Sequence, residues 1–573
     1  MSVEFSTLLD ESNSIRTEGT REITLICPIL QSDEDIEVDL SYTITSNCNT
    51  VIKCKHFNIL SSGVKISNVS FECAVTIRSI EDCTITNATI KDAESSNGAL
   101  TISDGVNVTL SHLTISDAKE IPGIYISENS VVLADNLHVH DLADTLVVVK
   151  NGSFVTVTDS NFHDSSGNGF YVYDQSSIEI SNCKFSKTVY SSIFATNSQS
   201  VVRKCEFKDI KKNGVSIEST EDFLIEKNHF YDIEDTAIRI FSHSTGVVDG
   251  NKIHNLDGNG INCNESKVTI KNNELFDLLY PAIAIISNST SIISGNIVNN
   301  IKYSGIVARG AKDVKIEGSK IKDVKESGIS ISDTLKAVIL NNEIDNCEVA
   351  AIEGYNSSVL SIYDNNISNI RKYAFLVFTS GIMEAKNNKI DHIGDKMVKL
   401  AYKGGGEFYD NQVENCEEQC DCQTTSNYFF KGNGQFKGVT NDPTRVQRNI
   451  VELGKPFVDT SLRCLKCNEK QRDHYLLDCG HKVYCKECAM MAHQNKENCP
   501  LCRFPITGVS GGFGVSKDEM CIICFENKAD SIILPCGHMG VCSVCLENWY
   551  KNKKSCPICR TEPCFYKKII NDI

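Results

Sequence analysis

The chain has 573 residues, 41% of them hydrophobic, and this length predicts several domains with a large buried core. Its 57 basic and 74 acidic residues leave a net charge of −17, which argues against binding to nucleic acid or to an anionic membrane. The first residues lack a basic and apolar leader, and no apolar run approaches about 18 residues. We therefore expect a cytoplasmic protein, with the nucleus as the alternative, that is neither secreted nor inserted in a membrane.

The first 65 residues do not follow the pattern of the residues after them. Apolar residues between Met1 and Asp10 suit a short capping helix, and Ile23–Ile90 alternates like strands but out of register with the later repeat. We assign residues 1–65 to an N-terminal cap and irregular first turns.

Residues 66–420 contain a repeat of about 23 residues. An apolar anchor returns every 22 to 24 residues, and every 23 residues from Leu275 to Val413. In most copies Asn stands two residues before the anchor, Asp or Asn two after it, and Gly or Ala seven after it. The anchors are Ile115, Val139, Phe162, Phe185, Phe207, Phe230, Ile253, Leu275, Val298, Ile321, Ile344, Ile367, Ile390 and Val413. Short alternating segments between Asn, Asp and Gly turns predict β-strands.

The period also suits leucine-rich repeats, but their Leu-x-x-Leu-x-Leu pattern is missing. The repeat resembles the right-handed parallel β-helix of the pectin-lyase-like class. This resemblance implies a mainly β solenoid with about three short strands per turn, stacked about 4.8 Å apart. The recurring Asn side chains would then form a hydrogen-bonded ladder along the stack.

Many proteins of that class act on polysaccharides through clustered carboxylates. Here Asp and Asn alternate freely in one column, as a ladder of turn residues does, and His163, Asp164 and Arg239 have no evident catalytic partners. We favour a structural role for this column, with a carbohydrate-active β-helix as the alternative.

Residues 421–461 are polar and predict a linker, with a strand around Tyr428–Phe430. Just before it, Cys416, Cys420 and Cys422 offer three ligands for a metal, but no fourth is evident, and unpaired thiols are favoured.

Residues 462–506 and 520–562 carry one cysteine–histidine pattern twice, Cys-x2-Cys-x11-Cys-x-His-x3-Cys-x2-Cys-x10-Cys-x2-Cys. The first copy comprises Cys464, Cys467, Cys479, His481, Cys485, Cys488, Cys499 and Cys502. The second comprises Cys521, Cys524, Cys536, His538, Cys542, Cys545, Cys556 and Cys559. Zinc takes four such ligands tetrahedrally, so sixteen ligands predict four zinc ions. A disulfide-linked tail is the disfavoured alternative. Residues 507–519, between the modules, are Gly-rich and predict a flexible joint.

This pattern resembles the RING finger family, in which the ligand pairs interleave. The resemblance implies that Cys521, Cys524, Cys542 and Cys545 hold one zinc ion, and that Cys536, His538, Cys556 and Cys559 hold the other. It also implies a RING-type ubiquitin-protein ligase. Such a ligase binds a ubiquitin-conjugating enzyme and positions its ubiquitin thioester for attack by a lysine, with no covalent intermediate of its own.

The resemblance also implies which residues contact the conjugating enzyme and ubiquitin. In the second module Ile522, Trp549 and Pro557 would contact the conjugating enzyme, and Arg560 would position ubiquitin. For Trp549 the alternative is a packed core residue. The first module matches less well, because Leu465 and Ala492 stand where the second has Ile522 and Trp549.

The whole chain thus predicts a ligase whose β-helix recognises a protein substrate that the sequence does not name. A non-enzymatic zinc-binding scaffold is the alternative. Residues 563–573 form an apolar tail with Phe565, Tyr566, Ile569 and Ile570, which suits either a homodimer through RING and tail or local packing on the finger.

Overall fold

A computed structural model describes residues 2–3, 21–95, 97–422 and 428–433 of the N-terminal part. In the C-terminal part it describes residues 464, 466–467, 470, 474–476, 482–498, 506, 509–510, 513–514, 521, 523–524, 527, 531–534, 538–552, 557 and 565–568. The chain forms two compact units, Met1–Asn449 and Ile450–Ile573. Within the described ranges, no helix has the length and hydropathy needed to cross a membrane.

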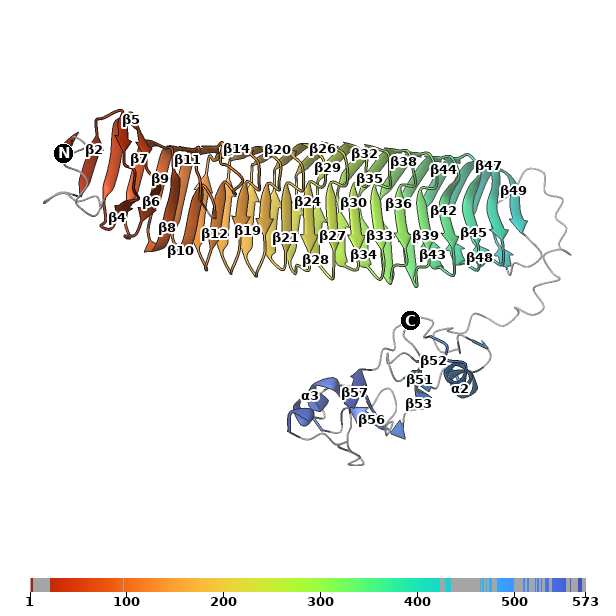
Figure 1. Ribbon diagram of the computed structural model, residues 1–573. Helices are drawn as coiled ribbons and strands as arrows, with labels where there is room; N and C mark the ends of the chain where they lie inside the picture. The colour runs from red at the N-terminus through yellow and green to blue at the C-terminus, as the bar shows by residue number, and fades with distance from the viewer. Residues whose placement is uncertain are drawn as a thin grey trace. The chain divides into compact units, whose positions relative to one another are not determined.

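The first unit is a right-handed β-solenoid of about 17 turns, which confirms the predicted mainly β, parallel β-helix (Figure 1). Its strands pair in parallel with strands of the next turn, and in the regular part each strand pairs with the third strand after it. The strands therefore lie in three rows along the solenoid, and each row is a parallel sheet.

The anchor row holds the strands that contain the predicted anchors. Ile115 lies in β11 (Val108–Ser116). From Val139 onward the strands are β14 (His138–Leu142), β17 (Asn161–Ser165), β20 (Lys184–Thr188), β23 (Glu206–Ile210), β26 (His229–Ile233), β29 (Lys252–Leu256), β32 (Glu274–Leu278), β35 (Ile297–Ile301), β38 (Lys320–Val324), β41 (Glu343–Cys347), β44 (Asn366–Ile370), β47 (Lys389–Ala401) and β49 (Gln412–Cys422).

The second row follows the anchor row in each turn. Its strands are β12 (Ile124–Ser127), β15 (Val147–Val149), β18 (Phe170–Val172), β21 (Ile193–Thr196), β24 (Val215–Glu218), β27 (Ile238–Phe241), β30 (Ile261–Asn264), β33 (Ile283–Ile286), β36 (Ile306–Arg309), β39 (Ile329–Ser332), β42 (Ala350–Tyr355) and β45 (Tyr373–Phe378).

The third row completes each turn. Its strands are β13 (Val131–Asp135), β16 (Phe154–Thr158), β19 (Ser177–Ser181), β22 (Gln199–Arg203), β25 (Phe223–Glu226), β28 (Thr245–Asp249), β31 (Lys267–Lys271), β34 (Thr290–Ser294), β37 (Asp313–Glu317), β40 (Ala337–Leu340), β43 (Val359–Tyr363), β46 (Ile382–Lys386), β48 (Gly405–Tyr409) and β50 (Tyr428–Lys431).

The anchors form the core of the solenoid. Every predicted anchor is buried, with at most 4% of its surface exposed. Each lies in register with the anchor of the next turn, as Phe207 does with Phe230, whose rings stack 4.6 Å apart between centroids. The period of about 23 residues is therefore the length of one turn.

The Asn residues that precede the anchors form the predicted ladder. Asn251 is 1% exposed, and its side-chain amide donates to Oδ1 of Asn273 and to the carbonyl of Ile225, both at 2.9 Å. Its own Oδ1 accepts from the backbone N–H and the side-chain amide of Asn228, each at 3.0 Å. Each such Asn side chain thus supplies hydrogen bonds to a backbone N–H and a backbone carbonyl that would otherwise be buried without partners.

The Asp and Asn residues that follow the anchors have left-handed backbone conformations. Asp141, Asp164, Asp209 and Asp232 have φ values of 53° to 54°, and Asn255 has 56°. Asp and Asn tolerate this conformation better than other non-glycine residues. The column therefore has the turn-forming role that the free alternation of Asp and Asn indicated.

The N-terminal turns belong to the same solenoid but differ in length. Their strands are β2 (Glu22–Leu25), β3 (Ile29–Gln31), β4 (Ile36–Val38), β5 (Thr43–Lys53), β6 (His56–Ile59), β7 (Lys65–Phe71), β8 (Ala74–Glu81), β9 (Thr84–Lys91), β10 (Leu100–Val106) and β11 (Val108–Ser116). Paired residues here lie 18 to 25 positions apart, as in Phe57↔Val75 and Thr84↔Thr109. This variation explains why the sequence pattern is out of register there.

The predicted capping helix is wrong at Ser2–Val3, which form β1 and pair in parallel with β2. The other residues of that predicted helix lie outside the described residues. At the opposite end, β50 pairs in parallel with β48, which confirms the strand predicted around Tyr428–Phe430. Cys416 is buried, and Cys420 and Cys422 are half-buried against the core.

The second unit contains two small modules with few apolar core residues. The first has β51 (His474–Leu476), β52 (Lys482–Tyr484), β53 (Val509–Ser510) and the helix α2 (Lys486–Gln494). The second has β54 (Phe513–Gly514), β55 (Ser531–Leu534), β56 (His538–Val541), β57 (Phe565–Lys568) and the helix α3 (Ser543–Asn552).

Two strands arise from the segment that was predicted to be a flexible joint. β53 pairs with β51 of the first module, and β54 pairs with β56 of the second. Val509–Ser510 and Phe513–Gly514 thus pair with neighbouring strands, while the rest of residues 507–519 lies outside the described residues and its flexibility stays a prediction. The tail also contributes a strand, since β57 pairs antiparallel with β55 of the same chain. Its backbone at 565–568 thus packs locally.

Candidate metal centres

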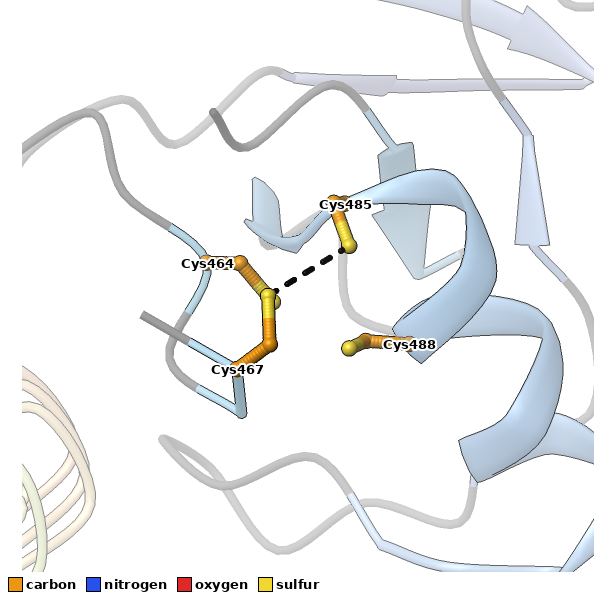
Figure 2. A group of neighbouring side chains, drawn as sticks. All are labelled: Cys464, Cys467, Cys485 and Cys488. Carbon is orange, nitrogen blue, oxygen red and sulfur yellow. Dashed lines mark hydrogen bonds between the residues drawn. The ribbon is translucent and has the colours of Figure 1, made fainter. Parts of the chain in front are cut away.

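Four cysteines converge in the first module (Figure 2). The sulfur atoms of Cys464, Cys467, Cys485 and Cys488 lie within 4.8 Å of one another, and those of Cys467 and Cys485 are 3.8 Å apart. Around a tetrahedral zinc ion with Zn–S bonds of about 2.3 Å, sulfur atoms lie about 3.8 Å apart. The donor set and its spacing therefore fit zinc.

The second module repeats this geometry. The sulfur atoms of Cys521, Cys524, Cys542 and Cys545 also lie within 4.8 Å of one another, with 3.9 Å between Cys524 and Cys542. In both modules the first, second, fifth and sixth ligands of the pattern come together. This is the interleaved set that the resemblance implied.

A loop and a helix position these ligands in each module. The backbone N–H of the first ligand donates to the carbonyl six residues later, from Cys464 to Lys470 at 2.8 Å and from Cys521 to Asn527 at 2.7 Å. The helices α2 and α3 begin directly after Cys485 and Cys542. The last two ligands of each set therefore lie at a helix N-terminus, where the helix dipole favours the thiolate that binds metal.

Backbone hydrogen bonds to the sulfur atoms also favour the thiolate form of these cysteines. The backbone N–H of Cys545 donates to Cys542 Sγ at 3.4 Å, and that of Ile523 donates to Cys521 Sγ at 3.5 Å. Desolvation, then hydrogen bonds with the neighbouring thiols, and last the charge of Cys521 raise the pKa of Cys545. Four thiolates together would repel one another. A divalent cation removes this repulsion, so metal binding and deprotonation are coupled.

The side chains of the other eight predicted ligands lie outside the described part of the chain. Of His538 only the backbone is described, in β56. The remaining seven lie outside the described residues, namely Cys479, His481, Cys499, Cys502, Cys536, Cys556 and Cys559.

The predicted docking residues are described in part. Trp549 lies on α3 and, like Pro557, is half-buried, whereas Ile522 and Arg560 lie outside the described residues. Docking of a conjugating enzyme by Trp549 and its alternative, a packed core role, both stay predictions. In the first module the corresponding Ala492 is completely buried.

The structure also exposes apolar residues that sequence reasoning missed. Ile523, beside Ile522 in the first knuckle of the second module, is 40% exposed, and Val544 is 57% exposed. Met490 and Met491 on α2 are 46% and 50% exposed. Two adjacent isoleucines inside Cys-x2-Cys were the signal for Ile523, since the sequence does not say which of them faces solvent.

Comparison with protein families agrees with this geometry. A family model described as a right handed beta helix region matches residues 41–202, 169–311 and 304–440, which together span more than half of the chain. The chain belongs to the right-handed β-helix family. A second model, the C3HC4-type zinc finger or RING finger, matches residues 460–509 and 517–564. Two RING fingers of this type bind four zinc ions, two in each finger.

The similar curated proteins share only a short segment with this chain. E3 ubiquitin-protein ligase NEURL3 of Rattus norvegicus is 41% identical over 46 residues, which are 8% of this chain and 18% of that protein. E3 ubiquitin-protein ligase rnf8-B of Xenopus laevis is 48% identical over 48 residues, 8% of this chain and 9% of that protein. The chain thus spans less than a fifth of the length of these relatives.

Among solved structures, the surface adhesin PfbA of Streptococcus pneumoniae is 14% identical with a TM-score of 0.29. The match covers 55% of this chain and 85% of the adhesin. At this identity and TM-score, the likeness says nothing about function.

Proposed function

We propose that this protein is a RING-type ubiquitin-protein ligase. In this proposal the second RING finger binds a ubiquitin-conjugating enzyme, and the β-helix binds the protein substrate. The zinc ions would be structural, because each takes four protein ligands and leaves no open position for chemistry. The ligase would act by holding the ubiquitin thioester near a substrate lysine, so its contribution is proximity and orientation.

The observation that carries this proposal is the pair of RING fingers at residues 460–509 and 517–564, together with relatives named as E3 ubiquitin-protein ligases. The surface of the second finger supports it. Ile523 and Val544 expose apolar side chains, and Trp549 is half-buried on the helix that follows the fifth ligand. Interfaces are anchored by aromatic and apolar residues of this kind.

A ubiquitination assay with purified full-length protein tests the proposal. The protein is mixed with an activating enzyme, ubiquitin, ATP and each member of a panel of conjugating enzymes, and ubiquitin chains are followed by immunoblot. We expect chains with at least one conjugating enzyme, and none after removal of zinc. If zinc-loaded protein with four ions per chain forms no chains with any enzyme, the scaffold alternative is correct.

For the β-helix, a candidate surface is an open cavity of about 390 Å³ on the outer face of the anchor row. It spans β32, β35, β38 and β41, and its lining includes Phe276, Ile297, Lys320 and Glu343. Ile297 is 48% exposed, and Lys252 lies over the Phe276 ring at 5.5 Å from its centroid. A ring, an aliphatic side chain and charges of both signs suit an extended segment of a protein substrate.

The test compares full-length protein with its Ile297→Asp variant in cells, by measuring the ubiquitinated proteins of each. The variant should lose substrates but keep its own ubiquitination in the purified assay. Asn366→Asp, an exposed position on the same row, is the control. An unchanged set of substrates would place recognition elsewhere on the chain.

A further inference from the structure

The outer surface of the anchor row carries two histidine pairs, and within each pair the two rings are in contact. His138 Nε2 and His163 Nε2 are 2.7 Å apart, and His229 Nε2 and His254 Nε2 are 2.9 Å apart. Each pair spans 25 residues, two more than the usual turn, because the partners are diagonal neighbours on adjacent strands. Register places His140, not His138, directly opposite His163. The first pair lies on β14 and β17, and the second on β26 and β29.

The first pair has a defined arrangement of protons. His163 Nδ1 lies 2.6 Å from Asp164 Oδ2, so the neutral ring carries its proton on Nδ1 and has a lone pair on Nε2. His138 Nε2 must therefore donate to it. Partial burial opposes ionisation of Asp164, but hydrogen bonds from His163 and Lys187 lower the pKa of Asp164 below its usual value and keep it charged. Desolvation, then His140 and His163, lower the pKa of His138, so this ring is neutral at neutral pH.

A third imidazole stands beside the pair. The His140 ring centroid is 4.4 Å from that of His138 and 5.0 Å from that of His163. His140 Nδ1 lies 2.6 Å from Asp141 Oδ2, so its Nε2 also carries a lone pair in the neutral ring. An imidazole whose Nδ1–H is held by a carboxylate and whose Nε2 is free is the usual form of a metal-binding histidine. His140 and His163 are 20% and 21% exposed, which leaves the site open to ions from solvent.

We propose that a divalent transition-metal ion of the Zn²⁺ or Ni²⁺ class binds between Nε2 of His138 and Nε2 of His163. Imidazole nitrogen is a preferred ligand of these ions. The ion takes the place of the shared proton, and His138 adopts its other tautomer, so no net proton is released. Two nitrogens on a tetrahedral ion with bonds of 2.0–2.1 Å lie about 3.3 Å apart, so the rings need to separate by about 0.6 Å. Water completes the coordination shell, and the His140 ring lies beside the site.

Isothermal titration with Ni²⁺ tests this site in the full-length, zinc-loaded protein. All proteins carry His254→Gln, which removes the second histidine pair. Into this background we introduce His163→Gln, His138→Gln or, as the matched control, His392→Gln. His392 has the same contact between Nδ1 and a neighbouring carboxylate, with Asp391 at 2.8 Å, but it is 61% exposed. Zinc released from the cysteines is measured in parallel and subtracted, and circular dichroism verifies the β fold of each variant.

The background protein should bind one Ni²⁺ per chain, with at least tenfold weaker binding after His163→Gln or His138→Gln and unchanged binding after His392→Gln. Ni²⁺ should also raise the melting temperature of the solenoid only in proteins that keep both histidines. Binding that is the same in all four proteins, or no binding to the background, would overturn the site.

Discussion

The Asn ladder gives a prediction whose size follows from measured contacts. Asn251→Asp keeps the shape of the side chain and its acceptor atoms, but it removes the amide that donates to Asn273 Oδ1 and to the Ile225 carbonyl, both at 2.9 Å. Two lost hydrogen bonds cost about 1 kcal/mol each, and a buried acceptor left without a donor costs about 1–3 kcal/mol more. We expect the free energy of unfolding to fall by about 3–5 kcal/mol at pH 7.

Asn255→Asp is the matched control, since it makes the same chemical change four residues away. Asn255 is exposed and occupies the left-handed column, where its side-chain amide donates to Oδ1 of Asp232 on the preceding turn. The control therefore loses one exposed hydrogen bond and gains an exposed charge beside Asp232, which together cost about 1 kcal/mol because solvent screens both. The assay is urea unfolding of zinc-loaded protein, followed by circular dichroism of the β-structure, with the change in midpoint compared between the variants.

The pH dependence of the difference adds a second measurement. Burial without a cation raises the pKa of the introduced carboxyl above its unfolded value, so the penalty is largest above that raised pKa and shrinks as pH falls. The two variants should therefore differ less at pH 5 than at pH 7. If Asn251→Asp is within about 1 kcal/mol of Asn255→Asp at pH 7, the ladder does not stabilise the solenoid as described.

The remaining predictions concern the RING fingers and one half-buried acid, Glu353. Metal analysis should find four zinc ions per chain, and chelation should unfold the RING fingers while the β-type circular dichroism persists. Trp549→Ala should weaken binding of the conjugating enzyme roughly thirtyfold with zinc content unchanged, whereas Leu465→Ala has little effect; the reverse order would make the first finger the active one. Arg560→Ala should slow ubiquitin transfer but preserve that binding, and equal loss of both would contradict a positioning role. Desolvation raises the pKa of Glu353 despite hydrogen bonds from two serine hydroxyls, so its ionisation costs stability that returns as pH falls. Glu353→Gln should therefore stabilise at pH 7 and have no effect below about pH 4, as urea midpoints would show.

The repeating part of the fold could be predicted because each turn imposes the same demands on the same positions. A buried anchor such as Leu275, a buried Asn such as Asn273 and a left-handed residue such as Asp277 each have one physical reason for their type. These reasons recur at one spacing, so a single sequence displays them as columns. The two cysteine sets were predictable for a similar reason, since zinc restricts both ligand type and spacing.

Features that depend on contacts between columns could not be predicted in this way. His138 and His163 belong to different columns, and only the strand register makes them neighbours. Val509–Ser510 looked like part of a joint because its two residues gain order from β51 and not from their own sequence. The exposure of Ile523 likewise depends on how the knuckle turns around the metal ligands.

The constant register of the later turns has a consequence for how this protein can change in length. Ile344 pairs with Ile367, and Ile367 pairs with Ile390, always 23 residues apart. Removing or duplicating one such stretch would again bring an anchor opposite an anchor and an Asn opposite an Asn. The solenoid can therefore gain or lose whole turns, each about 4.8 Å of length, without a new core or a new cap. Copy number would then set the extent of the outer faces while the RING fingers stay the same.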